Sequence, residues 1–219
     1  MRRSLLKILK SKTGILVLSL AVIHTPVVFG ENSGWLLPIG ASNRISWNTV
    51  QLTRIGFFGE IRKARPGIPA HLHTGLDIKR PGRNYVDEPV YAASRGRVIS
   101  VRQDGPYAQV IVEHKLPQGD KVWTVYEHIA GISVSTGDAV SADTPIGRFM
   151  NKTELDSFGW QFDHVHFEIL KHRPRALKPS PKTPSRFYGT YSLECYTPAD
   201  LTKYYFNPVD FLNARWNDG

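Results

Sequence analysis

The sequence predicts an all-β fold of antiparallel strands, arranged as a sandwich or an open barrel, with irregular extensions at both ends. Two observations support this prediction. Between residues 71 and 170, short runs rich in Val, Ile and Tyr recur, each bounded by Gly, Pro, Asp or Asn. Over the same stretch, the apolar residues show no convincing helical period across eleven positions. Such runs are typical of hairpins whose sheets share one core.

Taken in order, the chain begins its regular structure after a Gly- and Pro-punctuated stretch, residues 31–70, that is expected to form loops and turns. The expected strands lie in residues 88–103, 108–114, 121–129 and 164–170. Residues 172–186, "HRPRALKPSPKTPSR", are proline-rich and basic, which favours a solvated excursion. The aromatic run 204–216, "YYFNPVDFLNARW", is expected to pack back onto the body as a short closing helix.

Length and composition fit one soluble domain. The chain has 219 residues, 41% of them apolar and 21% charged, which is enough for a substantial core and argues against disorder. Of the formal charge of +9, five positive charges lie before residue 31, where there is no acidic residue. The remaining +4 is modest, so we expect no nucleic-acid partner.

The first thirty residues have the pattern of an export signal. A basic start precedes the ten-residue apolar run "GILVLSLAVI", which is shorter than the roughly 20 residues of a spanning helix. Val28 and Gly30 are the small residues expected before a cleavage site, so residues 1–30 are predicted to be a signal peptide. An uncleaved membrane anchor is the alternative. We expect a periplasmic or extracellular location in the cell envelope.

The single cysteine limits the chemistry. Cys195 has no partner for an internal disulfide, and one thiol cannot build a thiolate metal cluster. We interpret it as a small apolar packing residue. Any metal site must therefore use imidazole and carboxylate ligands.

The stretch "FDHVHFEI" carries two histidines on one side of an expected strand. Strand side chains alternate between faces, so Val165, Phe167 and Ile169 share the face that can be buried. His164, His166 and Glu168 share the other face. Imidazoles at this spacing suit a metal ion, although two ligands alone do not make a site.

A second histidine cluster, "HLHTGLD", covers residues 71–77. His73 and Asp77 are four residues apart and fall on one face in either a strand or a helix. Gly75 between them keeps that face uncluttered. A solvated histidine with a turn aspartate is the alternative for this stretch alone.

A third contribution is His128, at the end of "VWTVYEHI". Alternation places His128 on the same face as Val122, Thr124 and Tyr126, and we expect it to join the cleft of the other histidines. Taken alone, a histidine here would more often be structural. Two imidazoles and one carboxylate are a catalytic zinc set that leaves a fourth position for water. The H-E-x-x-H motif, the paired cysteines of deaminases, a P-loop and a G-x-S-x-G elbow are all absent from the sequence.

Together these motifs resemble the lysostaphin/LytM-type zinc metallopeptidases. The shared features are H-x₃-D, a lone histidine after a tyrosine-containing strand, and a late H-x-H followed by "FEI". Further stretches agree in order: "FGEIR", "HTGLDI", "PVYAASRGRV", "VYEHI" and "GDAVSADTPIG". The likeness covers roughly residues 54–170. It implies a small antiparallel β domain at residues 54–171, between an N-terminal segment at 31–53 and the excursion and closing segment at 172–219.

The resemblance also implies the roles of individual residues. His73, Asp77 and His166 would bind one Zn²⁺ per chain, while His128 and His164 would be the catalytic histidines. His71 matches no ligand position and is expected at the rim, and Glu168 is a candidate for orienting an imidazole. The implied activity is that of an exported endopeptidase that cuts peptide bonds in the stems or cross-bridges of peptidoglycan.

The chain also departs from the resemblance. Residues 148–163, "RFMNKTELDSFGWQFD", replace a short Gly-rich turn and are expected to border the groove, so substrate preference is not carried over. One alternative function is a non-catalytic binding or regulatory module of the same fold, with a regulatory envelope protein as partner. Another is a β domain that binds saccharide. The sequence does not indicate the oligomeric state.

Overall fold

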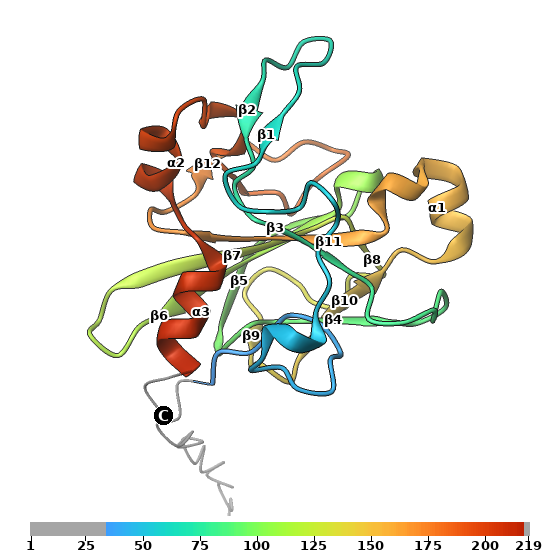
Figure 1. Ribbon diagram of the computed structural model, residues 1–219, viewed down its shortest axis with the longest axis horizontal. Helices are drawn as coiled ribbons and strands as arrows, with labels where there is room; N and C mark the ends of the chain where they lie inside the picture. Colours follow the sequence, from blue (N-terminus) through green and yellow to red (C-terminus); the bar gives the residue numbers. More distant parts are fainter. Residues whose placement is uncertain (1–33, 217–219) are drawn as a thin grey trace, which may run out of the picture. The chain divides into compact units, whose positions relative to one another are not determined.

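The computed structural model describes residues 34–216 (Figure 1). The predicted signal peptide, residues 1–30, lies outside them. The strands are β1 Ile61–Arg62, β2 His71–Leu72, β3 Leu76–Lys79, β4 Pro89–Tyr91, β5 Gly96–Arg102, β6 Gln109–Lys115, β7 Lys121–Glu127, β8 Ile129–Ala130, β9 Ala139–Val140, β10 Pro145–Phe149, β11 His164–Leu170, β12 Arg175–Ala176, β13 Tyr188–Gly189 and β14 Tyr205–Phe206. The helices are α1 Lys152–Phe158, α2 Pro198–Tyr204 and α3 Pro208–Trp216, with short 3-10 turns η1 Trp47–Thr49, η2 Gly105–Tyr107, η3 Trp160–Phe162 and η4 Ser192–Glu194.

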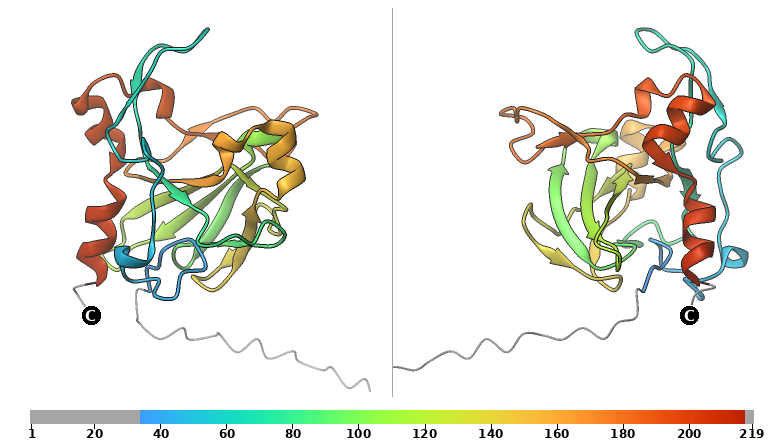
Figure 2. Two further views of the ribbon diagram at one scale, coloured as in Figure 1. Left: turned by 45° about the vertical axis from the view of Figure 1, so that its right-hand side comes forward. Right: turned by 90° about the vertical axis from the view of Figure 1, so that its left-hand side faces the viewer.

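The strands form an antiparallel sandwich. The larger sheet has the order β14-β11-β7-β6-β5-β9, and β3 also pairs with β11. A smaller sheet has the order β4-β10-β8. The main apolar core combines inward side chains of both sheets, such as Val110 and Phe167 from the larger and Val90 and Phe149 from the smaller. The predicted all-β class is confirmed, in its sandwich form (Figures 1 and 2).

The apolar residues of β3 and β11 occupy this core as predicted. Val165, Phe167 and Ile169 of β11 are fully buried, and so are Leu76 and Ile78 of β3. Because neighbouring strand residues point to opposite faces, this burial directs the intervening polar side chains to the outer face of the larger sheet.

The outer face of the larger sheet is divided in two. One part carries a second apolar cluster, in which Ile111, Val125 and Leu170 pack against Cys195 and Leu201 from the C-terminal region. Cys195 is thus a packing residue, and its burial raises the pKa of the thiol to about 12. The other part of the same face carries the polar side chains described below.

Both chain extensions pack onto the body. The closing helix is α3, as predicted, and its Phe211 and Leu212 lie in the main core, where Phe211 meets the ring of Trp35 edge to face at 4.8 Å. In the N-terminal segment, Leu37 and Ile39 are also fully buried in this core. In the part of the chain that is described, no helix is both long and apolar enough to cross a membrane.

The segment 148–163 contains one helix that periodicity did not reveal. Helix α1 begins with a capping box, in which the Asn151 side chain accepts from the backbone N–H of Glu154 and the Glu154 carboxylate accepts from that of Asn151. Buried Arg80 ties the end of this segment to β3 by donating to the Asp163 carboxylate at 2.8 and 3.0 Å. The segment is therefore held firmly beside the histidine-bearing strand β11.

Candidate metal centre and groove

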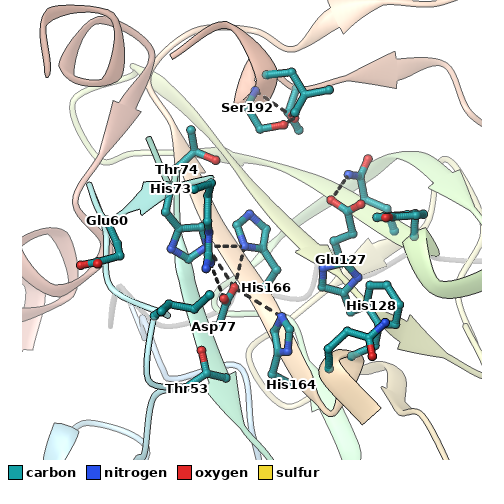
Figure 3. A pocket seen from close by; sticks show the side chains of 18 of the residues that line it. Thr53, Glu60, His73, Thr74, Asp77, Glu127, His128, His164, His166 and Ser192 are labelled. Carbon is teal, nitrogen blue, oxygen red and sulfur yellow. Dashed lines mark hydrogen bonds and ion pairs between the residues drawn. The ribbon is translucent and has the colours of Figure 1, made fainter. Parts of the chain in front are cut away.

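The candidate site is built on a row of polar side chains that crosses the larger sheet. In the strand registers, Asp77 of β3 lies opposite His166 of β11, and His166 lies opposite Glu127 of β7. Glu127 lies opposite Gln109 of β6, which lies opposite Arg102 of β5. Figure 3 shows the first three side by side. We call Asp77, His166, Glu127, Gln109 and Arg102 the polar row; it forms part of the lining of an open groove of about 1640 Å³.

Three donor atoms converge at one end of the polar row. Asp77 Oδ1 lies 3.0 Å from His73 Nε2 and 2.9 Å from His166 Nδ1, and the two ring nitrogens are 2.9 Å apart. Zinc bonds of about 2.0 Å in a tetrahedral site would separate such ligands by about 3.3 Å, close to the spacing observed. All three residues are buried, and they form a group that could hold a metal ion.

The outward hydrogen bonds of the two histidines point their lone pairs at this position. His73 Nδ1 lies 2.9 Å from the Phe57 carbonyl oxygen, which can only accept a hydrogen bond. The proton therefore sits on Nδ1, and the lone pair of Nε2 is free to bind a metal ion. His166 Nε2 lies 2.9 Å from the Glu168 carboxylate, which leaves Nδ1 free. Two imidazole lone pairs and a carboxylate oxygen within 3.0 Å of one another repel unless a cation lies between them. The donor set therefore fits a zinc ion.

Asp77 is held as a carboxylate. Burial alone would raise the pKa of Asp77, but its close contacts with His164, His166 and His73 outweigh burial and keep that pKa far below its ordinary value. Its second oxygen, Oδ2, accepts from the Arg62 guanidinium at 2.5 Å. Arg62 belongs to β1, so the β1–β2 hairpin helps to orient the carboxylate.

His164 and His128 lie beside these donor atoms. His164 Nε2 is 3.4 Å from Asp77 Oδ1, and its ring meets that of His128 edge to face at a centroid distance of 4.9 Å. His128 Nδ1 donates to the Pro106 carbonyl at 2.6 Å, so Nε2 carries the lone pair. Burial, and next the neighbouring His164, lower the pKa of His128 to about 3. Its imidazole is therefore neutral and able to accept a proton.

The alternation of side chains along a strand does not explain the position of His128. The face of β7 that carries Val122 and Tyr126 is buried in the main core, so the predicted placement of His128 on that face is wrong. The regular strand ends at Glu127, and His128 has a φ of +64°, the one positive value at a non-glycine residue among residues 34–216. This left-handed conformation turns the ring toward the groove.

Glu168 occupies the boundary between the polar row and the apolar cluster. It is 1% exposed, and its Oε1 accepts both from His166 Nε2 and from the Thr74 hydroxyl, the latter at 2.5 Å. Gly75 permits this close packing, because a Cβ there would overlap the carbonyl group of Phe167 on β11. His71, by contrast, lines the groove with Nδ1 bonded to the Pro69 carbonyl and stays outside the donor set.

Sequence reasoning missed several groove residues. Glu127 was assigned to no role, although its side chain lies next to His166 in the sheet register and accepts from Gln109 at 3.2 Å. Arg62 and Arg186, both at the groove, were also missed. The segment 148–163 does border the groove, as predicted, with Trp160, Gln161, Phe162 and Asp163 in its lining.

The larger sheet of the antiparallel sandwich thus carries a buried His–Asp–His group that could hold a metal ion. The model of peptidase family M23 matches residues 71–179 of this chain. The chain therefore belongs to peptidase family M23, as the resemblance to the lysostaphin/LytM type implies.

Individual relatives were also found. Stage II sporulation protein Q of Bacillus subtilis (strain 168) is 31% identical over 102 residues, which are 46% of this chain and 32% of that protein. The match thus spans about a third of the length of this curated relative. A zinc-containing peptidase from Vibrio cholerae is 27% identical, with a TM-score of 0.39 over 54% of this chain and 32% of that chain. Lysostaphin from Staphylococcus simulans is 19% identical, with a TM-score of 0.40 over 67% and 47% of the two chains.

Proposed function

We propose that the protein is an exported, zinc-dependent endopeptidase that hydrolyses peptide bonds in bacterial cell-wall peptidoglycan. The observation that carries this proposal is the convergence of His73 Nε2, Asp77 Oδ1 and His166 Nδ1 beside two further imidazoles. A zinc ion held there would polarise the scissile carbonyl and lower the pKa of a bound water. Membership of peptidase family M23 supports the same assignment.

The residues of the chain divide into two roles in this proposal. His73, Asp77 and His166 would hold the metal, with Glu168 and the Phe57 carbonyl fixing the tautomers of the two histidines. His128, neutral and with its Nε2 lone pair free, would take a proton during hydrolysis and return it to the leaving amine. His164, in ring contact with His128, would stabilise the negative charge that develops on the carbonyl oxygen.

Export and the substrate class are inferred from the sequence. The basic and apolar pattern of residues 1–30 supports export, and peptidoglycan is the substrate class that the resemblance implies. The mature N-terminus, determined from the purified protein, tests the first point, and a protein that begins at Met1 would contradict cleavage.

The central test measures metal content and peptidoglycan cleavage on the same preparation. We expect one zinc per chain, and new amino groups from purified peptidoglycan that a chelator abolishes. His73→Ala should lose both metal and activity, whereas His128→Ala should keep the metal and lose roughly 10²–10⁴-fold in rate. Full activity in either variant would overturn the assigned roles. Zinc binding without cleavage of any wall peptide would favour the non-catalytic module instead.

A further inference from the structure

Two arginines meet at the end of the polar row farthest in register from Asp77. Arg102 closes the row on β5, and Arg186 is the last residue of the proline-rich excursion. The segment carrying Arg186 runs beside β5, because the Val101 N–H donates to the Ser185 carbonyl at 2.9 Å and the Ser100 hydroxyl accepts from the Tyr188 N–H at 3.1 Å. Both guanidinium groups line the groove.

The two guanidinium groups differ in their hydrogen bonding. Arg102 donates to both oxygens of Asp104, at 2.6 and 3.1 Å. Arg186 has a buried Nε with no hydrogen-bond partner among the described residues. Burial, and next the charge of Arg102, lower the pKa of Arg186, as expected for a cation that lacks a close anionic partner. A buried, unpaired N–H of an arginine is costly, so an anion that reached it would be bound favourably.

This position is close to the histidines of the site. Arg102 lies over the ring of Tyr107 at 5.6 Å, and the Tyr107 ring is 5.7 Å from that of His128. These two contacts place Arg102 within about 11 Å of His128, so an extended peptide with one bond at His128 would reach the arginines within about three residues. The groove as a whole is lined by nine Lys and Arg residues against five Asp and Glu residues within 34–216, which favours an acidic peptide.

We propose that Arg186, together with Arg102, forms a subsite that binds a free carboxylate on the peptide, within a few residues of the bond that is cut. This inference rests on the proposed function and specifies its substrate: peptides that carry a free carboxylate rather than its amide. Arg186 lies beyond residue 179, where the match to the family model ends, whereas Arg102 lies within the matched residues. The planar guanidinium can bind both carboxylate oxygens at once. The nearby Asp104 and Glu127 disfavour ligands of higher negative charge, such as phosphate groups.

The first test uses binding, which needs no catalysis. The full protein, with and without zinc, is titrated with a soluble peptidoglycan stem tetrapeptide and with the same peptide after amidation of its carboxylates, and each Kd is measured by calorimetry. We expect the acid to bind about tenfold more tightly than the amide. Arg186→Gln should reduce this preference to about twofold or less, and Arg186→Lys should give an intermediate value. Lys182→Gln, which removes an equal charge from an exposed position of the same segment, should keep the tenfold preference.

Equal binding of acid and amide by the wild-type protein, or an unchanged preference in folded Arg186→Gln, would overturn the inference. A second test distinguishes the carboxylate subsite from the peptidase activity. It compares the rate of cleavage of a cross-linked stem-peptide dimer with that of its amidated form. Cleavage of both at the same rate would contradict the subsite and leave the peptidase intact. A binding preference without cleavage of either would contradict the peptidase and support the subsite.

Discussion

Replacement of Glu168 by Gln tests whether the Glu168 carboxylate orients His166 for metal binding. In the wild-type protein the Glu168 carboxylate accepts from His166 Nε2 at 2.9 Å and so leaves Nδ1 as the atom that would bind the proposed metal. Gln keeps an acceptor of the same shape but removes the charge. A hydrogen bond to a charged group contributes about 1.5–3 kcal/mol and a neutral one about 1 kcal/mol. The difference of about 0.5–2 kcal/mol corresponds to a loss of roughly 2- to 30-fold in zinc affinity.

Competition with a chromophoric chelator measures this loss directly. Glu60→Gln is the matched control, since Glu60 is an exposed carboxylate that also lines the groove. We expect this variant to bind zinc within twofold of the wild-type protein. If Glu168→Gln binds zinc as tightly as Glu60→Gln, the carboxylate does not support His166 and the reasoning is refuted.

Three further predictions concern stability. Gly75→Ala should lower the free energy of unfolding by roughly 2 kcal/mol in urea titrations, because the added Cβ overlaps the Phe167 carbonyl group, and it should also weaken zinc binding. His114 is buried and neutral, with a pKa lowered to about 4, so the unfolded chain binds its proton first. Stability should therefore fall by about 3 kcal/mol as the pH drops from about 6.5 to 4, and much less in a His114→Gln variant. Arg80→Ala should lower the free energy of unfolding by roughly 3 kcal/mol, because it leaves the Asp163 carboxylate without its partner. The loss should appear as a lower Tm. An unchanged Tm would show that the pair does not anchor residues 148–163.

The fold could be predicted because its strands are amphipathic in a simple way. In β11 the alternation of Val165, Phe167 and Ile169 with polar residues fixes one face in the core and presents His164 and His166 on the other. The helices were harder to predict from periodicity, because α1 has only seven residues. Its capping box, Asn151 with Glu154, was the available signal.

The parts of the site that escaped prediction depend on pairings between strands and on single backbone angles. The sequence near Glu127 does not predict that this residue lies opposite His166, because the register depends on how β7 and β11 pair. The direction of the His128 ring depends on one left-handed residue, for which an alternating pattern gives the wrong face. Arg186 ends a proline-rich run that looks solvated, and hydrogen bonds between this segment and β5, Val101 to Ser185 and Tyr188 to Ser100, bring it to the groove.

The wide sequence separation of the proposed metal ligands affects the folding and persistence of the protein. His73 and His166 are 93 residues apart in sequence, so the ligands meet only after β3 and β11 have paired. A metal ion would thus bind the native chain and hardly bind the unfolded one. At a free concentration a thousand times its Kd it would add about 4 kcal/mol to the free energy of unfolding. The lifetime of the protein against proteolysis would then depend on the zinc available in its compartment, even when no substrate is present.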